Sequence, residues 1–509
     1  MLDASPRNAH VPGPFDVLVV GGGINGTGIA RDAAGRGFRV ALAEQGDLAS
    51  GTSSASSKLV HGGLRYLEHG AFRLVREALT EREILLRAAP HIVRPLRFVL
   101  PHAPGMRPAW MLGLGLRLYD RLGARRVLPG SKCIDLARHP AGEPLARHGG
   151  TAFTYSDCWV EDARLVILNA LDAARHGATV TTRTRVAMLE ARAGGWHATL
   201  EDRRSGATRT IEARAVVDAA GPWAGTLGAA GARRPRLVKG SHVVVPRLFE
   251  HDHAYVLQNA DGRIVFAIPF EGAFTLIGTT DVDHPDPPGP VDASPEEVAY
   301  LCEVARHWFT RAVTPEDVVH SFAGLRALDA RPDGQASRAS RDYHLSLARE
   351  DGSPILRIVG GKITTYRRLA EQAVNRIGDA LDRRRPPWTG EAVLPGGNVP
   401  ADGIGALATQ LLARHPRLGP AAANRLAHTY GSECTDMLGD EPGGEVAPGV
   451  FEAELRHARQ HEWVETADDF LWRRTRLGLT CDSADREAIE RWLESHPRPT
   501  RKGALSYPA

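Results

Sequence analysis

The spacing of apolar and polar positions predicts a strand, a helix and a second strand near the start of the chain. Residues 15–20 form an apolar run, as in a buried parallel strand, and residues 27–36 have a helical pattern that Gly37 ends. A second apolar run at 40–43 stops at Glu44. Two strands joined in this order by one helix predict a βαβ unit and a parallel sheet.

The same periodicity divides the rest of the chain into segments that add strands to this sheet, a β-rich part and a helical part. The further predicted strands are 179–189, 196–202, 208–213, 215–221, several within 236–281, and 355–359. The predicted helices are 67–89, a helix capped by Asp162, 295–308, 364–381 and a helical domain at 401–495 that follows a linker at 386–400.

A glycine motif at the end of the first strand adds chemistry to the βαβ unit. Gly21, Gly23 and Gly26 make a G-x-G-x-x-G turn between strand and helix. The first glycine allows the tight turn, the second lets the backbone approach a pyrophosphate, and the third lets the helix pack on the strand. Glu44 ends the second strand, where a carboxylate binds ribose hydroxyls and repels a 2′-phosphate. The unit therefore predicts NAD or FAD rather than NADP.

Length and composition predict a soluble globular protein of two or three domains. The chain has 509 residues, 43% hydrophobic and 24% charged, and its net charge of +3 is too balanced to suggest a nucleic-acid binder on composition alone. Five scattered cysteines form no C-x-x-C motif and fit a reducing compartment. No His, Cys, Asp or Glu grouping has metal-ligand spacing, so no metal is expected. The first 14 residues lack the apolar core of a signal peptide, and no apolar run is long enough to span a membrane.

Two further segments have the composition of cofactor loops. Residues 49–57 are rich in serine and run directly into Lys58, His61 and Arg65, which favours a loop wrapped around a cofactor over a flexible linker. Near the other end, the strand at 355–359 runs through a glycine pair and Lys362 into a helix, and a helix N-terminus of this kind binds anions or a ring.

Residues 107–127 and 364–385 are candidates for contact with a membrane surface. The first segment is an apolar block flanked by arginines, and it is either a core helix or an interfacial helix on anionic lipid. The second carries several arginines, which anionic lipid would attract.

The motifs HGGLRY, KGSHVVVP, IGTTD, GLR, RDY and GGKITTYRRLAE, together with the glycine turn, decide between the two dinucleotides. With them the chain closely resembles the aerobic, FAD-dependent glycerol-3-phosphate dehydrogenases, from about residue 15 to 495. That family usually has proline after the arginine of GLR, whereas this chain has Ala327.

The resemblance implies an α/β fold in three parts. These are a Rossmann-like FAD-binding domain of the glutathione-reductase/D-amino-acid-oxidase type, a β-rich substrate cap and an α-helical C-terminal domain. The expected ranges are 15–75, 150–230 and 320–385 for the split FAD-binding domain, 76–149 and 231–319 for the cap, and 386–509 for the C-terminal domain.

The resemblance also implies a reaction and its residues. It implies oxidation of sn-glycerol 3-phosphate to dihydroxyacetone phosphate, with a hydride transferred to FAD. Arg65, Arg326 and Arg341 are expected to contact the substrate together with Tyr66, since arginines bind phosphate in bidentate fashion. The expected catalytic residues are His242, Arg326 and Lys362.

His242 is expected to be the general base, because an unperturbed histidine has a pKa near ~6.5. Lys362 is expected to assist the flavin N1–C2=O region or the substrate oxygen. The residues expected to bind FAD are Gly21, Gly23, Asn25, Gly26, Glu44, Thr52, Ser53, Ser57, Lys58, His61, Gly63, Leu64, Val186, Gly221, Trp223, Gly361, Lys362 and Thr364.

The partners implied are glycerol 3-phosphate, a membrane quinone as electron acceptor and an anionic membrane surface, and a homodimer is allowed. The implied location is cytoplasmic, peripheral on the inner face of the cytoplasmic membrane.

The residues by themselves leave other functions open. A glycerol-3-phosphate oxidase would use O2, and a related FAD-dependent amine or alcohol oxidase would share the fold. A non-catalytic flavoprotein would carry FAD that the substrate does not bleach, and an NAD-linked enzyme would not be yellow.

Overall fold

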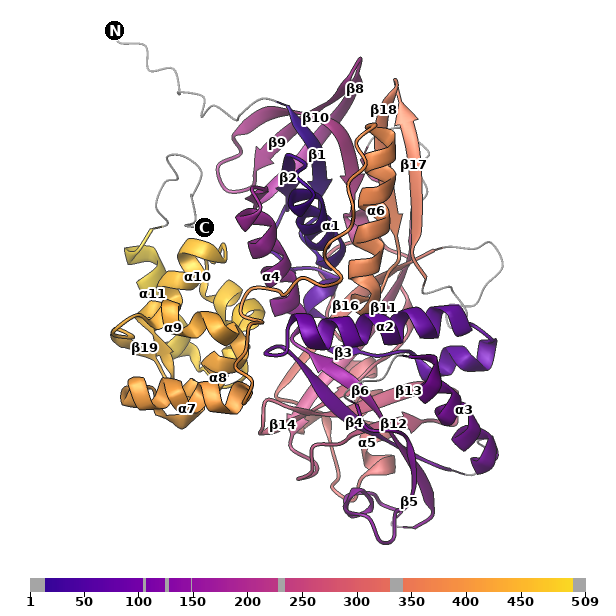
Figure 1. The fold of residues 1–509 in the computed structure, drawn as a ribbon. Helices are drawn as coiled ribbons and strands as arrows, with labels where there is room; N and C mark the ends of the chain where they lie inside the picture. The colour runs from indigo at the N-terminus through magenta and orange to yellow at the C-terminus, as the bar shows by residue number, and fades with distance from the viewer. Residues whose placement is uncertain are drawn as a thin grey trace.

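Two large β-sheets and a helical C-terminal domain make up the protein (Figure 1). The structure is a computed structural model, and it describes residues 14–103, 107–123, 128–147, 149–227, 234–329 and 342–497. The arrangement confirms the predicted α/β fold with a β-rich second part and a C-terminal helical domain.

The first sheet contains the predicted βαβ unit. Strand β1 (Phe15–Val20) is fully buried and leads into helix α1 (Ile24–Gly35), which returns the chain to β2 (Val40–Ala43). The strands of the main path, in spatial order, are β17 (His344–Glu350), β18 (Ser353–Val359), β10 (Thr208–Asp218), β1, β2 and β7 (Thr179–Thr181). All neighbours from β18 to β7 are parallel, while β17 pairs antiparallel with β18 at the edge.

Two strand predictions in this sheet differ from the structure. The expected strands 208–213 and 215–221 are one strand, β10, because no glycine or proline interrupts them. Its first half pairs antiparallel with β9 (Gly195–Asp202) and its second half runs parallel to β1. The single strand expected at 179–189 is instead two, β7 and β8 (Thr184–Arg192), and the break lies at Arg183, which has a positive φ of 49°.

The second sheet is the β-rich part. Its strands are β3 (Leu59–Val60), β4 (Val93–Pro101), β5 (Lys132–Asp135), β6 (Thr151–Val160), β11 (Arg236–Pro246), β12 (Ala254–Gln258), β13 (Ile264–Phe270), β14 (Phe274–Gly278), β15 (Val282–Asp283) and β16 (His320–Leu328). Strands β6 and β16 pair in this sheet although they fall in ranges expected for the FAD-binding domain. Helix α5 (Pro295–Trp308), which starts at a Ser294–Glu297 capping box, packs against β11.

Helix α1 is the centre of the core on the first sheet. It packs between α4 (Asp162–Arg175) and α6 (Tyr366–Ala380), and all three contribute to one apolar cluster with β1, β2 and β10. Gly28 makes the close approach possible, since a Cβ there would lie 2.7 Å from the ring of Tyr366. Arg367 of α6 is buried in ion pairs with Glu81 and Glu371. Helix α6 is therefore a core helix at Arg367, whereas Arg376, Arg384 and Arg385 are exposed, so contact of this segment with a membrane stays a prediction.

Helix α3 (Ala109–Leu122) belongs to the segment for which the sequence left a core or an interfacial position open. Only Leu116 and Tyr119 of this helix are buried. Trp110 is 69% exposed and Leu114 60% exposed, and the helical spacing places them on one outer face. This exposed apolar face favours the interfacial alternative, and α3 lies at the outer edge of the second sheet in Figure 1. In the described part of the chain, no helix combines the length and the hydrophobicity needed to cross a bilayer.

The C-terminal domain has its own core. Its helices are α7 (Ile404–Arg414), α8 (Gly419–Tyr430), α9 (Cys434–Leu438), α10 (Glu452–His461) and α11 (Ser483–Ser495), with a π-helical turn at Asp469–Arg474 and the short strands β19 (Glu445–Ala447) and β20 (Val450–Phe451). It is tied to α4 by a buried ion pair, in which one Arg164 nitrogen lies 2.7 Å from each Glu462 carboxylate oxygen.

Candidate active site

Several loops meet at one edge of the first sheet. Val20, Ala43 and Asp218 are aligned in neighbouring parallel strands, so β1, β2 and β10 end together, and β18 ends beside them. The loops that follow these strands contain most of the residues expected to bind the cofactor. Ligands of open α/β sheets bind outside the carboxyl ends of the strands, and this edge is the corresponding place here.

The glycine turn has the shape that a pyrophosphate requires. A Cβ on Gly26 would overlap the carbonyl oxygen of Gly21, and one on Gly21, whose φ is +110°, would lie 2.6 Å from the carbonyl oxygen of Ala219. Asn25 donates to the carbonyl of Gly360 at 3.2 Å, while its own buried carbonyl oxygen has no hydrogen-bond partner among the described residues. A glycine turn at a helix N-terminus, where backbone N–H groups point toward a bound anion, fits a dinucleotide phosphate.

Glu44 is held against this turn. Its carboxylate accepts a hydrogen bond from the backbone N–H of Gly22 at 2.6 Å and another from that of Gly46 at 2.7 Å. Burial raises the pKa of Glu44, and these two backbone donors oppose that rise. The acid is therefore positioned by backbone groups beside the glycine turn, as a ribose ligand would need to be.

The serine-rich loop lies across the glycine turn and the second sheet. Ser53 Oγ accepts from the N–H of Ile24 at the start of α1, at 3.0 Å. Thr52 donates to the carbonyl of Leu325 in β16 at 2.5 Å, and Ser57 Oγ lies 2.9 Å from His242 Nε2. The loop thus connects the dinucleotide turn to the β-rich part, which a plain linker would not do.

Lys58 supports this loop from inside. Its buried ammonium lies 2.9 Å from both carboxylate oxygens of Asp162 and 2.9 Å from the carbonyl oxygen of Ser54, and burial lowers its pKa. Direct contact of Lys58 with the cofactor stays a prediction.

His242 is buried in β11, opposite Phe322 of β16 and Gly278 of β14. Its ring stacks on Phe322 with 4.8 Å between centroids, and glycine is required at 278 because any Cβ there would overlap the ring. Burial lowers the pKa of His242 well below the usual value, and the positive charges of Arg326 and Lys58 lower it further. The ring is therefore neutral at physiological pH and can accept a proton.

Arg326 lies on the same face of the sheet as His242. The register pairs Val238 with Arg326 and His242 with Phe322, so the two side chains project from the same side of neighbouring strands. Its guanidinium pairs with Asp281 and donates to Thr279 Oγ1 at 2.8 Å. Gly240 between them has no side chain, and any Cβ there would overlap the guanidinium.

Lys362 and Tyr66 come together from distant parts of the chain. The Lys362 ammonium lies 3.8 Å from the centre of the Tyr66 ring, and the N–H of His61 donates to Thr364 Oγ1 at 3.3 Å. The loops around 61–66 and 360–364 are thus adjacent, as their predicted roles require. Arg341 and the side chain of Arg65 lie outside the described residues.

The remaining expected cofactor residues have more varied surroundings. Gly63 and Gly221 adopt positive φ values of 73° and 58°, which glycine permits, and Trp223 lies close to Gly51. Leu64 packs against the core of the second sheet, and the side chain of Val186 is buried in the core. Only backbone atoms of Val186 are therefore suited to contact a cofactor.

Comparisons with known proteins decide which enzymes share this arrangement. A family model described as "FAD dependent oxidoreductase" matches residues 16–367, and one described as "C-terminal domain of alpha-glycerophosphate oxidase" matches residues 388–495. A glycerol-3-phosphate dehydrogenase from Pseudomonas aeruginosa is 48% identical over 98% of this chain and 99% of its own length. The chain belongs to the FAD-dependent glycerol-3-phosphate dehydrogenase family.

Other members of this family are similarly close. An aerobic glycerol-3-phosphate dehydrogenase from Escherichia coli is 45% identical over 94% of this chain and 97% of its own length. A D-erythritol 1-phosphate dehydrogenase from Brucella abortus is 45% identical over 95% and 98%. The solved glycerol-3-phosphate dehydrogenase of Bacillus halodurans, complexed with FAD, superimposes with a TM-score of 0.75 at 29% identity and covers 95% of this chain and 90% of its own. FAD is therefore the cofactor of this family member.

Sequence reasoning missed two aspartates, Asp162 and Asp47, whose ion pairs support the loops at the FAD site. Asp162 was expected to cap a helix, but the N-cap is Glu161, and the Asp162 carboxylate instead binds Lys58 and accepts from Ser56 Oγ at 2.8 Å. Asp47, three residues after Glu44, is buried in ion pairs with the C-terminal domain. No motif marks either aspartate, because their partners are 100 to 400 residues away.

Proposed function

We propose that this family member oxidises sn-glycerol 3-phosphate to dihydroxyacetone phosphate, and that the electrons pass through FAD to a membrane quinone. The single observation that carries the proposal is the placement of His242. It is a buried neutral imidazole between Ser57 of a cofactor loop and the cation Arg326. The names of the relatives support the substrate, and the geometry supplies a base and a phosphate-binding cation on one face.

The cofactor would be held by the groups at the edge of the first sheet. The backbone turn at Gly21–Gly26 and the N-terminus of α1 would bind the pyrophosphate, and Glu44 the ribose. The serine-rich loop and the 360–364 loop would cover the remaining part of the FAD molecule. When bound, FAD accepts the hydride from the substrate carbon.

The substrate's phosphate requires cations. Arg326 and Lys362 supply two of them, and Arg65 and Arg341 are predicted to add two more. The guanidinium of Arg326 is held by Asp281 and Thr279, so its direction is set before the substrate binds. A pre-oriented guanidinium favours a bidentate contact with a phosphate over one with a neutral ligand.

The proton of the substrate hydroxyl is assigned to His242. We assign it to Nε2, since this nitrogen faces the serine-rich loop, and the hydroxyl of Ser57 can rotate to donate elsewhere. Loss of the hydroxyl proton to His242 and of the carbon-bound hydride to the flavin converts the secondary alcohol into a ketone. Stacking on Phe322 orients the ring.

A second candidate substrate is D-erythritol 1-phosphate. The relative from Brucella abortus that carries this name is as similar to the chain as the Escherichia coli glycerol-3-phosphate dehydrogenase. Both substrates are polyol phosphates, and the same cation and base would serve both. The electron acceptor has an alternative as well, because an oxidase would use O2.

Anaerobic titration of the purified flavoprotein tests the reaction. Addition of sn-glycerol 3-phosphate is expected to bleach the flavin absorbance near 450 nm (roughly the position for oxidised flavins), and a quinone analogue is expected to restore it. D-erythritol 1-phosphate is the matched comparison, with bleaching rates giving the preference. No bleaching by either compound would contradict the proposal, and rapid peroxide release in air without quinone would assign an oxidase.

Membrane contact is proposed through α3. Its outer face carries the apolar side chains Trp110, Met111, Leu114 and Leu118, and Arg117 and Arg121 are exposed on the same helix. An amphipathic helix with basic flanks lies in the lipid interface, with its apolar side chains among the acyl chains. This contact would bring the flavoprotein to the bilayer, where a quinone is dissolved.

The double variant Trp110→Ser/Leu114→Ser is expected to lose most binding to vesicles that contain anionic lipid. Each large apolar side chain contributes about 1.5–3 kcal/mol when buried, so the partition should weaken at least about tenfold. Sedimentation with vesicles measures it, and Met188→Ser, an exposed apolar residue on β8, is the control. High salt should release the wild-type protein only in part. Complete release by salt alone, or unchanged binding of the double variant, would contradict an apolar contact through α3.

A further inference from the structure

A dense group of ion pairs joins the C-terminal domain to the loop that follows Glu44. Asp47 in this loop is buried, and its carboxylate accepts bonds from two Arg474 nitrogens, at 2.7 and 2.9 Å, and from Arg473 at 2.6 Å. Both arginines end the π-helical turn Asp469–Arg474. Turns of this rare type are frequent at functional sites, and here the turn presents two cations to one carboxylate.

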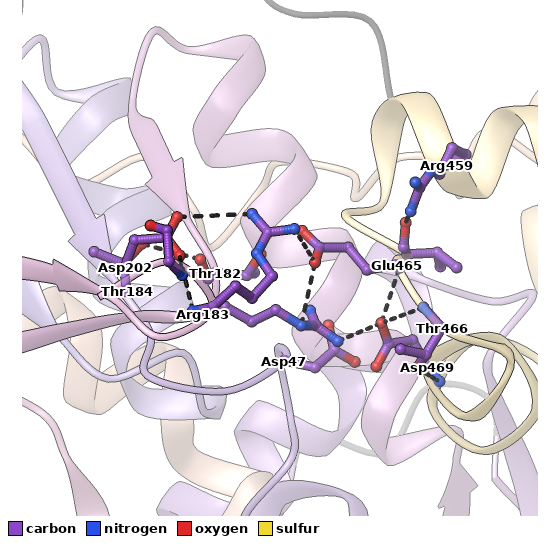
Figure 2. Close-up of polar contacts among 12 residues, drawn as sticks. Asp47, Thr182, Arg183, Thr184, Asp202, Arg459, Glu465, Thr466 and Asp469 are labelled. Carbon is purple, nitrogen blue, oxygen red and sulfur yellow. Dashed lines mark hydrogen bonds and ion pairs between the residues drawn. The ribbon is translucent and has the colours of Figure 1, made fainter. Parts of the chain in front are cut away.

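A second contact runs in the opposite direction, from the first sheet to the same turn. Arg183, at the break between β7 and β8, donates through its backbone N–H to the carbonyl of Gly46 at 2.8 Å. Its side chain donates to Asp469 at 2.7 Å and lies 3.2 Å from Glu465. Figure 2 shows Arg183 pointing toward Glu465 and Asp469, with Asp47 beside them. The loop at 44–49 is thus held by Arg473 and Arg474 and by a backbone hydrogen bond from Arg183, whose side chain binds the same turn.

The 44–49 loop is in turn bonded to the glycine turn. Gly22 donates to Glu44, and the N–H of Ala49 donates back to the carbonyl of Gly22 at 3.1 Å. A Cβ on Gly22 would lie 2.8 Å from Leu48, so the two segments are in close contact. A displacement of Asp47 would therefore move Glu44 and the turn that is proposed to bind the pyrophosphate.

Arg476 makes a similar connection to the serine-rich loop. This buried arginine pairs with Glu161 and lies 3.5 Å from Asp162, the carboxylate that also holds Lys58 and Ser56. Its other nitrogen lies 2.9 Å from Glu271 in the loop between β13 and β14. One short segment of the C-terminal domain, residues 469–476, is therefore connected to both loops that border the cofactor site.

The charges in this junction depend on each other. Burial alone would raise the pKa of Asp469, but the charges of Arg474, Arg183 and Arg473 lower it to about 2. Burial raises the pKa of Glu44, and the negative charge of Asp47 raises it further. Arg473 and Arg474 offset the Asp47 charge, which otherwise repels an ionised Glu44.

We propose that residues 469–476 are positioning residues for FAD, which hold the 44–49 loop through Asp47 and the serine-rich loop through Asp162. Docking of the C-terminal domain and binding of FAD then favour each other, since a coupling between two binding events is reciprocal. The inference rests on the proposed placement of the FAD ribose at Glu44. It gives the C-terminal domain a role in the cofactor site through the two loops that its residues 469–476 contact.

Arg474→Gln is the main test, made on the full-length holoenzyme. Free FAD released after dilution is followed by its fluorescence, and FAD affinity is measured by reconstitution of the apoprotein. We expect the variant to bind FAD about 5- to 150-fold more weakly, the usual range for coupled sites. Arg473→Gln removes one contact to Asp47 and should weaken FAD binding less. Arg476→Gln should weaken FAD binding through the serine-rich loop. Arg474→Lys should have an FAD affinity between those of the wild type and Arg474→Gln.

Arg425→Gln is the matched control for destabilisation of the C-terminal domain. Arg425 forms a half-buried two-bond pair with Glu454, at 2.6 and 2.7 Å, entirely within that domain. It resembles the Arg474 pair in having two short bonds to one carboxylate, and its hydrogen-bond partners among the described residues, Glu454 and the Gly449 carbonyl, both belong to the C-terminal domain. We expect a lower unfolding temperature for this variant, with FAD affinity within twofold of the wild type.

Four outcomes would overturn the proposal or separate it from its premise. Wild-type FAD affinity in Arg474→Gln, or an equal loss in Arg425→Gln, would overturn the coupling. Glu44→Gln tests the premise directly, because the amide keeps the size of the side chain but loses its charge. Weaker FAD binding in Glu44→Gln together with unchanged binding in Arg474→Gln would leave the proposed function intact and refute the coupling. Unchanged binding in Glu44→Gln would refute the ribose placement on which the coupling rests.

Discussion

Gly26→Ala protein is expected to purify almost without FAD. The added Cβ would overlap the carbonyl oxygen of Gly21. Neither atom can give way, because Gly21 itself adjoins the carbonyl of Ala219 and the turn is closed on both sides. Overpacking of this kind costs about 3 kcal/mol, which corresponds to a loss of about a hundredfold in FAD affinity. The ratio of flavin absorbance to protein absorbance measures the effect.

Gly405→Ala provides the control for this substitution. Gly405 lies in α7, with no atom near the position of an added Cβ. Alanine should be tolerated there and should stabilise the helix by up to about 1 kcal/mol, with the FAD content unchanged. A full complement of FAD in Gly26→Ala would show that the turn does not bind the pyrophosphate.

His242→Gln is expected to slow reduction of the flavin by substrate about 10²- to 10⁴-fold, the usual contribution of a general base. Glutamine has a similar reach and retains a partner for Ser57, but it cannot take up the proton. FAD should remain bound, so the loss should appear in the rate of anaerobic bleaching in a stopped-flow experiment. His253→Gln changes a half-buried histidine outside the site and should leave the rate unchanged.

The pH dependence of the wild type supplies a second measurement on the same residue. Since burial and two nearby cations lower the pKa of His242, the imidazole stays unprotonated well below pH 6.5. The activity should therefore hold as the pH falls through 6.5 and decline only at lower pH. A decline centred near 6.5, or bleaching by His242→Gln at the wild-type rate, would assign the proton to another group.

Most of the cofactor-binding half of the site could be predicted from local sequence. Gly21, Gly26 and Glu44 lie within one βαβ unit, and the constraints on each act over a few residues: a turn, a helix start and a strand end. The loops that contain His61 and Lys362 are adjacent, as their predicted roles at one cofactor require. The errors were at strand boundaries, as at Arg183, where a positive φ interrupts a pattern that reads as continuous.

The protonation state and the surroundings of the catalytic groups could not be predicted from local sequence. The pKa of an isolated histidine favours His242 as the base, but its actual environment comes from Phe322 and Arg326 of β16 and from Lys58 of the serine-rich loop. The arginines of α6 suggest a membrane-facing patch in the sequence, yet Arg367 is buried against Glu81, which lies on another helix. A charge pattern alone does not reveal a partner that is distant in the chain.

The sequence by itself determined the dinucleotide unit, the α/β fold with a helical C-terminal domain, and the family, because these follow from local periodicity and from motifs with fixed spacing. Only the tertiary structure decided that His242 is neutral, that α3 rather than α6 presents an apolar outer face, and that Asp47 and Asp162 connect the cofactor loops to residues 469–476. The physical reason is the same in each case. Burial and the Coulomb interaction depend on which groups are close in space, and folding brings together groups that are hundreds of residues apart.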